Sequence, residues 1–260
     1  MRIGIIGLGR IGSFIYEEIN KNKELPIEIA FVHDIDQEKL KALPEDVVLE
    51  KMEEFERKSP DLVLESSHPD VVKKWGEFIL SKCNFMIMSV TAMADQDLEK
   101  RLLDTCNRYN SSLFIPHGAL VGLDGIIDGK DIWEEVTITM HKNPKNLDFS
   151  ASNIDPLTIK EKRVIYDGPV RGVCSQFPRN VNSHATLALA GIGMDKTRSV
   201  LIADPSLDES IIEIMAKSGG TMIEIKRRNP IKGVTGKLTL LSVFSTLLRV
   251  TNIGSGIHII

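Results

Sequence analysis

Residues 1–12 of the chain read MRIGIIGLGRIG, in which an apolar run at 3–6 leads directly into the pattern Gly7-x-Gly9-x-x-Gly12. A short apolar run predicts a buried strand, and residues 11–22 have the spacing of an amphipathic helix. Three glycines between such a strand and helix are typical of a dinucleotide-binding turn. In that turn Gly7 permits the sharp bend, Gly9 allows a pyrophosphate to approach the backbone, and Gly12 lets the helix pack closely on the strand.

The residues around this motif predict which dinucleotide is bound. The N-terminus of the helix, with Arg10 and Ile11, offers backbone N–H groups to phosphates. Asp34 follows the last glycine of the motif by 22 residues, at the end of the second predicted strand. There its carboxylate would accept hydrogen bonds from ribose hydroxyls and repel a 2′-phosphate, so NAD is the expected cofactor and NADP the alternative. Asp36 is a second candidate for the ribose, although it also suits the cap of a helix beginning near Gln37.

The first 118 residues alternate between strand and helix patterns. Apolar runs predict buried strands at 3–6, 27–32, 61–65, 84–90 and 112–116, and amphipathic stretches predict helices at 11–22, 69–82 and 95–109. Strand–helix–strand units of this kind imply right-handed crossovers and an open parallel sheet. The expected fold class is α/β, with a Rossmann dinucleotide-binding domain at 1–118. A flavodoxin-like fold with a glycine-rich turn is the competing interpretation, which the context of the motif disfavours.

The pattern changes after residue 122, where apolar and polar residues begin to alternate. Val136, Ile138 and Met140 alternate with threonines, as in a strand with one covered face. Similar strands are expected at 162–166, 199–203, 210–215 and 221–226, interrupted by one helix at 182–190. These elements predict a second, α+β domain at 119–234 for substrate binding and dimerisation. A last helix is expected at 237–250, within a C-terminal segment at about 235–260, and the first domain is one candidate partner for it. Its apolar stripe comprises Leu238, Leu241, Phe244, Leu247 and Leu248.

Composition and charge exclude several classes of protein. The 260 residues are 42% hydrophobic and 26% charged, which is ordinary for a globular protein, and the net charge of −4 provides no basic field for nucleic acid or an anionic membrane. No apolar run approaches a membrane span, and the run at 3–6 lacks the features of a signal peptide. The three cysteines form no CxxC pair, and the His, Asp and Glu residues lack metal-ligand spacing. We therefore expect a cytoplasmic protein with no metal site.

Beyond the glycine motif, several segments occur in the order of one enzyme family. They are SVTAMAD at 89–95, HGALVGLD at 117–124, FPRNVN at 177–182, ATLALAG at 185–191 and ADP at 203–205. In these segments, which span nearly the whole chain, the sequence resembles the L-aspartate dehydrogenases. The resemblance implies a two-domain, usually homodimeric enzyme that oxidises L-aspartate with NAD or NADP. It also implies the product iminoaspartate, which feeds NAD biosynthesis or hydrolyses to oxaloacetate and ammonia.

The same resemblance implies that Ala119 and Asn182 contact the cofactor. Small residues after the last Rossmann strand let the backbone approach a nicotinamide ring, and an asparagine side chain offers a donor and an acceptor to its carboxamide. From the residues alone, simple packing at Ala119 and a helix N-cap at Asn182 are the alternatives. Arg179 and Lys142 are candidates for binding the carboxylates of the substrate.

At the position of the family's catalytic histidine the chain departs from the pattern. The family follows its Ala-Asp-Pro with Asn-x-His, and the matching residues here are Ser210-Ile211-Ile212. Isoleucine cannot transfer a proton, so another group must do so if the chemistry persists. His184, in the small-residue helix, is the first candidate and His117, at the carboxyl end of a strand, is the second. For each, a structural histidine bonded to a backbone carbonyl is an equal alternative.

These observations predict an NAD(P)-dependent oxidoreductase acting on the CH–NH2 group of a small amino acid, with L-aspartate as the first candidate. A dehydrogenase or reductase for another small acid is the alternative among enzymes, because Ile212 also changes the shape of the pocket. From a different class, the alternative is a cofactor-binding sensor or regulatory protein without turnover.

Overall fold

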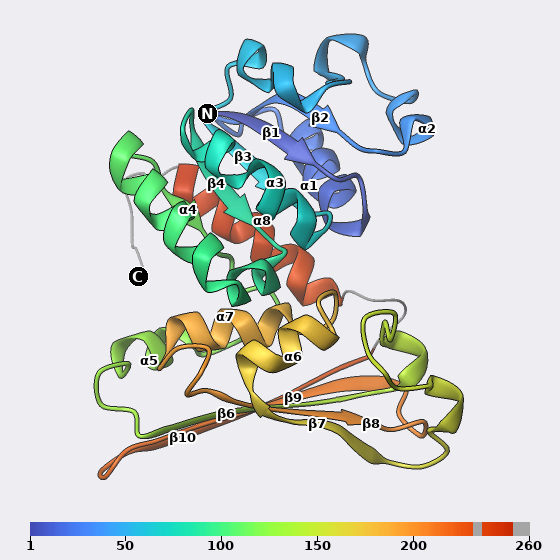
Figure 1. Ribbon diagram of the computed structural model, residues 1–260. Helices are drawn as coiled ribbons and strands as arrows, with labels where there is room; N and C mark the ends of the chain where they lie inside the picture. Colours follow the sequence, from blue (N-terminus) through green and yellow to red (C-terminus); the bar gives the residue numbers. More distant parts are fainter. Residues whose placement is uncertain (231–235, 252–260) are drawn as a thin grey trace.

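The computed structural model describes residues 1–230 and 236–251 and contains two five-stranded sheets, one above the other in Figure 1. The upper sheet is fully parallel, with the order β2-β1-β3-β4-β5. Its strands are β1 (Arg2–Ile6), β2 (Glu28–His33), β3 (Leu62–Glu65), β4 (Asn84–Ile87) and β5 (Leu113–Phe114). All five predicted strands are present, although β4 and β5 are shorter than expected. After β4 the chain turns into the 3-10 helix η3 (Val90–Ala94).

A single bridge extends the upper sheet beyond β2 and defines its topology. Val48 pairs in parallel with Val32 of β2, so the chain passes along the outer side of β2 before it crosses to β3. With Val48 as a reduced outer strand the order is that of a Rossmann domain, whereas the order without it also occurs in flavodoxin-like folds. The connection contains the 3-10 helices η1 (Glu45–Val47) and η2 (Met52–Lys58). The predicted Rossmann fold is therefore confirmed.

Helices cover both faces of the upper sheet. Alternating strand residues divide between two apolar clusters: Ile3 and Ile5 join the cluster that contains α1 and α8, and Phe31 and Val63 join the one that contains α3 and α4. Burial on both faces explains why the strands of this half are continuous apolar runs. The helices are α1 (Arg10–Lys21), α3 (Pro69–Leu80), α4 (Gln96–Tyr109) and α8 (Lys237–Thr251).

The lower sheet is mixed, with the order β10-β9-β6-β8-β7, and only β6 and β8 run parallel. Its strands are β6 (Glu135–Lys142), β7 (Arg163–Pro169), β8 (Arg198–Ala203), β9 (Glu209–Lys217) and β10 (Met222–Pro230). The helices α5 (Leu123–Asp128), α6 (Val170–Gln176) and α7 (Asn182–Ala190) lie between this sheet and the upper half (Figure 1). The expected α+β character is confirmed, but the prediction of a single helix here was wrong, since α5 and α6 are too short to show helical periodicity.

Helix α8 follows the lower sheet in sequence but packs on the upper one. Phe244 meets Phe14 of α1 edge to face, with 6.4 Å between ring centroids, and Leu247 is fully buried. The predicted apolar stripe was too broad, because Leu238 and Leu241 are 44% and 43% exposed. Residues 252–260 of the predicted C-terminal segment lie outside the described residues. Within the described part of the chain, no helix is both long enough and apolar enough to cross a membrane.

Candidate functional site

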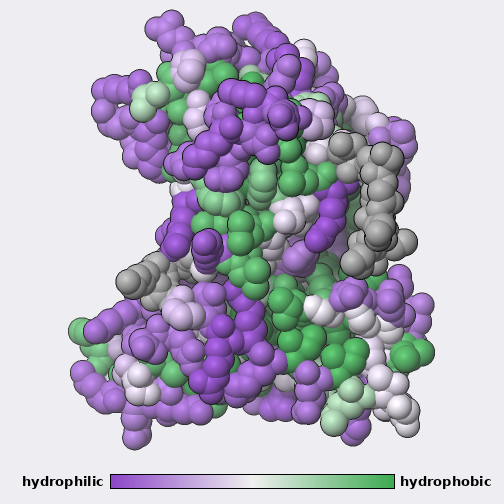
Figure 2. Space-filling view, turned by 180° about the vertical axis from the view of Figure 1, so that it is seen from behind, coloured by the Kyte–Doolittle hydropathy of each residue, from purple (hydrophilic) through white to green (hydrophobic). Residues whose placement is uncertain are grey.

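A cleft of about 1160 Å³ lies between the two halves. The turns that follow β1 to β5 form one wall, and the inward faces of β6, β9 and β10 contribute the other. Seen from behind, the molecule narrows at this level and hydrophobic surface gathers along the waist (Figure 2). Open α/β sheets bind ligands at the carboxyl ends of their strands. The cleft is also larger than the roughly 300–1,000 Å³ of a pocket for one small ligand, as a dinucleotide with a substrate requires.

The glycine-rich turn has the geometry that its sequence predicts. Gly7 adopts a φ of 95°, which favours glycine, and its N–H donates to the carbonyl oxygen of His33. A Cβ at Gly12 would overlap the carbonyl oxygen of Gly7, so only glycine allows α1 to approach β1 this closely. At Gly9, by contrast, a Cβ would come no closer than 3.9 Å to the carbonyl oxygen of Ser66. The space beside Gly9 therefore belongs to the cleft.

The N-terminus of α1 is open to the same cleft. Gly9 is the N-cap residue and provides no side-chain hydrogen bond to the first turn. Arg10 and Ile11, the first residues of the helix, line the cleft. A helix N-terminus without a side-chain cap presents backbone N–H groups and the positive end of the helix dipole, which suit a phosphate. The residues present thus fit the pyrophosphate of a dinucleotide.

Asp34 lines the cleft beside this turn although it is only 6% exposed. Its carboxylate accepts hydrogen bonds from the N–H groups of Leu8, at 2.6 Å, and Asp36, at 2.8 Å, and lies 3.4 Å from the Lys39 ammonium. Burial alone would raise the pKa of Asp34, but these hydrogen bonds and the lysine charge hold it below its ordinary value. The carboxylate is therefore ionised at neutral pH.

Two residues near Asp34 complete this end of the cleft. Asp36 caps the short helix α2 (Gln37–Leu40) by accepting from the N–H of Glu38, in agreement with the capping interpretation. Lys39 also lines the cleft, and the sequence alone did not identify it as a site residue. Because its ammonium neighbours Asp34, it offsets part of the repulsion that the carboxylate would exert on a 2′-phosphate.

A buried glutamate that the sequence analysis missed organises the turns after β3 and β4. Glu65 is fully buried and accepts hydrogen bonds from the backbone N–H and hydroxyl groups of both Ser67 and Ser89. Burial raises the pKa of Glu65 against the effect of these bonds. Both serines line the cleft. Glu65 therefore positions two turns of the cofactor wall.

The two residues that the family resemblance assigns to the cofactor both line the cleft. Ala119 follows Gly118, which has a φ of 57°. The carbonyl oxygen of Ala119 accepts a hydrogen bond of 2.7 Å from Arg227. The Asn182 side-chain oxygen accepts from the N–H of Thr91 in η3, which ties α7 to the upper half. Asn182 is not a helix cap, because the N-cap residue of α7 is Val181 and no side chain caps the helix.

His184, the first candidate for proton transfer, lies outside the cleft. It is fully buried between α7 and β8, where its Nδ1 lies 2.7 Å from the Ser199 hydroxyl. Its Nε2 has no hydrogen-bond partner among the described residues. Burial lowers the pKa of His184 to about 3, so the ring is neutral and cannot exchange protons with a ligand it does not reach. The ranking of His184 above His117 is corrected accordingly.

His117, the second candidate, does line the cleft, at the end of the segment that follows β5. Its Nδ1 lies 3.2 Å from the carbonyl oxygen of Leu120 and 3.1 Å from the hydroxyl oxygen of Ser242 in α8. A carbonyl can only accept, which favours the tautomer that carries its proton on Nδ1. The other nitrogen, Nε2, is then an acceptor.

The wall formed by the lower sheet is defined by strand register. Met140 of β6 pairs with Ile212 of β9, which in turn pairs with Arg227 of β10. Directly paired residues share a face of an antiparallel sheet. Residues two positions apart on a strand lie on the same face of the sheet, so the wall extends along each of the three strands. The residues that line the cleft on this wall are Met140, Lys142, Ser210, Ile212, Arg227 and Asn229.

Two cations therefore flank Ile212, and the sequence alone identified only one of them as a candidate. Arg227 is half-buried and is held by the Ala119 carbonyl and by the Asn229 side-chain oxygen, at 3.3 Å. Lys142 is 5% exposed, and burial lowers its pKa to about 8. Arg179, the predicted substrate ligand, lies at the rim, where it is 62% exposed and 3.3 Å from the Asp148 carboxylate. Among the described residues, no group of three or more His, Cys, Asp or Glu side chains could hold a metal ion.

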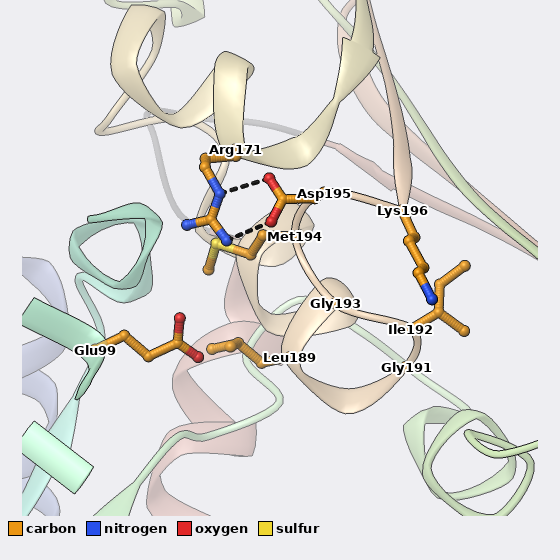
Figure 3. Close-up of a pocket in the computed structure, with 9 residues that line it drawn as sticks. All are labelled: Glu99, Arg171, Leu189, Gly191, Ile192, Gly193, Met194, Asp195 and Lys196. Atoms are coloured by element: carbon orange, nitrogen blue, oxygen red, sulfur yellow. Dashed lines mark hydrogen bonds and ion pairs between the residues drawn. The ribbon is translucent and has the colours of Figure 1, made fainter. Parts of the chain in front are cut away.

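A smaller cavity of about 300 Å³ lies between α4 and the segment after α7. In Figure 3 the Arg171 guanidinium faces the Asp195 carboxylate, while Lys196 lies on the other side of the loop. Arg171 donates to Asp195 at 2.6 and 2.8 Å and to the carbonyl oxygen of Ala94 at 2.6 Å. Its donors thus fasten α6 to η3 across the junction of the two halves. This cavity is a structural joint, and the large cleft is the candidate active site.

An open helix N-terminus beside a glycine-rich turn, at the carboxyl edge of a Rossmann sheet, defines the class of NAD(P)-dependent oxidoreductases. Family models agree with this class on both halves of the chain. Residues 7–116 match the NAD-binding domain of homoserine dehydrogenase, and residues 127–250 match the C-terminal domain of aspartate dehydrogenase.

Relatives identify the family. The L-aspartate dehydrogenase of Nitrosopumilus maritimus is 32% identical, over 95% of this chain and 96% of that protein. An aspartate dehydrogenase domain-containing protein of Xenopus tropicalis is 31% identical, over 100% of this chain and 98% of that protein. The crystal structure of aspartate dehydrogenase from Thermotoga maritima superposes with a TM-score of 0.74 at 27% identity, over 100% of this chain and 99% of that one. The chain belongs to the L-aspartate dehydrogenase family.

Proposed function

We propose that the protein oxidises L-aspartate to iminoaspartate with NAD(P)⁺ as oxidant. The observation that carries this proposal is Arg227, which lies with the buried Lys142 on the sheet wall that faces the dinucleotide turn. A dicarboxylate must exchange its hydration for protein cations, and an arginine can bind a carboxylate through two parallel hydrogen bonds. When bound, NAD(P)⁺ supplies the acceptor for the hydride that leaves the substrate Cα.

In this proposal the residues of the upper half hold the cofactor together with Ala119 and Asn182. The turn of Gly7, Gly9 and Gly12 and the helix N-terminus at Arg10 and Ile11 bind the pyrophosphate. Asp34 binds the adenine ribose and favours NAD over NADP, with Lys39 limiting that preference. Ala119 and Asn182 lie at the nicotinamide end. Residues 1–118, with α8, form the cofactor domain, and residues 119–234, of which 231–234 lie outside the described residues, form the domain for substrate binding and dimerisation.

Arg227 is the proposed ligand of a substrate carboxylate. The Ala119 carbonyl and the Asn229 side chain orient its guanidinium, and no carboxylate of the described residues forms an ion pair with it. Arg179 at the rim is the second candidate, since Asp148 already occupies part of its hydrogen-bonding capacity. The charge of Arg227 is therefore available to an acidic substrate.

The test compares two neighbouring arginines on opposite faces of β10. Arg227→Met removes a charged hydrogen bond worth about 1.5–3 kcal/mol, which corresponds to roughly a 10- to 150-fold rise in KM for L-aspartate. Arg228→Met is the matched control, because Arg228 is exposed and pairs with Glu209 at 2.8 Å. Equal KM values for the two variants would reject Arg227 as the carboxylate ligand.

Ile212 favours one alternative substrate class. Ile212 and Met140 make the centre of the sheet wall apolar, which suits a small acid that carries an apolar group beside its carboxylate. In that case the protein would be a dehydrogenase for such an acid, or a cofactor-binding protein if none is turned over. A panel of amino and hydroxy acids separates these functions by their rates of NAD⁺ reduction.

We further propose a homodimer that forms through the open face of the lower sheet. None of the described helices covers this face (Figure 1), and its half-buried or buried residues include Thr139, Val200, Ile202, Ile211 and Met215. A sheet face with this apolar content needs a cover. Light scattering is expected to give a dimer at micromolar concentration and a monomer for Val200→Lys; a monomeric wild type would reject the interface.

The three free cysteines suit a reducing compartment, and we assign the protein to the cytoplasm.

A further inference from the structure

The residue that ends β6 occupies an unusual place in the cleft. Lys142 lies on the inward face of the lower sheet, two residues beyond Met140, which pairs with Ile212. Its side chain is 5% exposed, and that remaining exposure is to the cleft. A diagonal neighbour on one sheet face lies about 7–8 Å away, within reach of a lysine side chain. The Lys142 amine can therefore occupy the space in front of Ile212.

Nothing in the described structure neutralises this amine. Within residues 1–230 and 236–251, the Lys142 ammonium forms no ion pair and no hydrogen bond. Its neighbour on β8 is Ala203, and Asp204, whose N–H donates to the Lys142 carbonyl, has its carboxylate engaged by Ser206. Removing an ammonium from water without a partner disfavours its charged form.

The other ionisable groups at this end of the cleft do not change that conclusion. They are His117, Lys145, Asp148, Arg179 and Arg227. All but Asp148 are cationic or neutral and cannot stabilise a second positive charge. Asp148 itself accepts from the N–H of Ser150 and lies beside Arg179. Burial accordingly lowers the pKa of Lys142 to about 8, so that roughly a tenth of the amine is free at pH 7 and about half of it at pH 8.

His117 is the rival proton carrier, but its surroundings place it beside the cofactor and not beside the proposed carboxylate ligand. It lies in the upper half, next to Gly118 and Ala119, where the nicotinamide is expected. Its Nδ1 is fixed by the Leu120 carbonyl and the Ser242 hydroxyl. Lys142, in contrast, lies on the same wall as Arg227, the proposed carboxylate ligand.

We propose that Lys142 is the catalytic base of this dehydrogenase and takes the role of the histidine that is replaced by Ile212. The inference rests on the proposed aspartate oxidation. The free amine of Lys142 accepts one proton from the substrate ammonium, which leaves a neutral amine on Cα. The nitrogen lone pair then forms the C=N bond as the Cα–H bond breaks and its electron pair leaves as hydride to the oxidised nicotinamide. The products are the iminium acid, the reduced cofactor and the Lys142 ammonium.

The first test measures the amine itself, without substrate or turnover. Protein labelled at the lysine ε-carbon is titrated by NMR, and Lys142→Arg identifies the Lys142 signal. Lys217→Arg, at the exposed far end of β9, is the matched control. We expect the Lys142 signal to titrate near pH 8 and to be unaffected by Lys217→Arg. Titration of Lys142 near 10.5, the ordinary value, would overturn the assignment.

The second test separates proton transfer from carboxylate binding. Arginine keeps the positive charge but does not lose its proton, so Lys142→Arg is expected to lower kcat by about a hundredfold to ten-thousandfold. Binding of succinate, a dicarboxylate without an amine, should change little. In the wild type, kcat should rise with pH through the pKa of the base, and this rise should be absent in Lys142→Arg.

Three outcomes would overturn the inference. Lys142→Arg could keep its kcat, as a purely charge-binding residue would. Lys142→Arg could lose succinate binding and kcat together, which would mark a structural or binding role. Alternatively, His117→Gln could abolish the pH-dependent rise while Lys142→Arg preserves it. A wild type that does not oxidise aspartate would count against the proposed function, whereas the NMR titration judges Lys142 by itself.

Discussion

Substituting Gly9 by alanine tests the cofactor site without disturbing the fold around it. Gly9 has φ −77° and ψ −165°, which alanine also adopts. A methyl group at this position would meet only the Ser66 carbonyl oxygen, at an ordinary contact distance of 3.9 Å. We therefore expect Gly9→Ala to unfold at nearly the wild-type temperature.

The same methyl group projects into the cleft, where the pyrophosphate would contact the backbone. Forcing a methyl group into a close-packed contact costs about 1–3 kcal/mol, or roughly a 5- to 150-fold rise in Kd. Gly220→Ala is the matched control, because a Cβ there meets no atom within 4 Å and the β9–β10 turn does not line the cleft. Gly12→Ala is the contrasting variant, since its Cβ would overlap the Gly7 carbonyl and should reduce stability as well.

Calorimetric titration with NADH, combined with thermal unfolding, distinguishes these variants. Gly9→Ala is expected to lose affinity at constant stability, Gly12→Ala to lose both, and Gly220→Ala to lose neither. If folded Gly9→Ala bound NADH as tightly as the wild type, the placement of the pyrophosphate at this turn would be refuted.

Three further predictions follow from individual side chains. Asp34→Ala should weaken NADH more than NADPH binding, because it removes a ribose acceptor and a charge that repels a 2′-phosphate; equal losses in titrations of both cofactors would exclude that role. His184 has a folded pKa of about 3 against an ordinary 6.5, so the unfolded chain binds the extra proton and stability should fall as pH drops from 6.5 towards 3, by up to about 1.4 kcal/mol per pH unit. Denaturant unfolding at several pH values checks this, and His184→Gln should flatten the slope. Ile212→His should raise kcat by less than about tenfold if Lys142 already carries the proton; a larger gain would indicate a site that lacked only its base.

The cofactor wall could be predicted from the sequence because its signals are local. Gly7, Gly9 and Gly12 mark a turn whose spacing is fixed by backbone geometry, and Asp34 follows at the end of the next strand. Lys39 was not identified although it lies only five residues after Asp34, and Glu65 could not be found from a local signal. The role of Glu65 depends on Ser67 and Ser89, which follow two different strands and meet it only when β3 and β4 pair in the sheet.

The substrate wall was harder to predict, because strand periodicity gives two faces without saying which one borders a ligand. Lys142 and Arg227 lie on different strands, 85 positions apart in the chain, and only the register through Ile212 brings them together. His184 was misplaced for a related reason. Helix α7 is buried on nearly every side, so its composition does not reveal which face points into the cleft.

Oxidation of L-aspartate by NAD(P)⁺ is the central claim, and the most direct measurement follows the absorbance of the reduced nicotinamide at mildly alkaline pH. The purified protein is mixed with NAD⁺ or NADP⁺ and, in separate reactions, L-aspartate, D-aspartate, L-glutamate or L-malate. We expect L-aspartate to give the highest kcat/KM, with ammonia released in step with cofactor reduction. Tight NADH binding without aspartate oxidation, or a higher kcat/KM for another acid, would contradict the account.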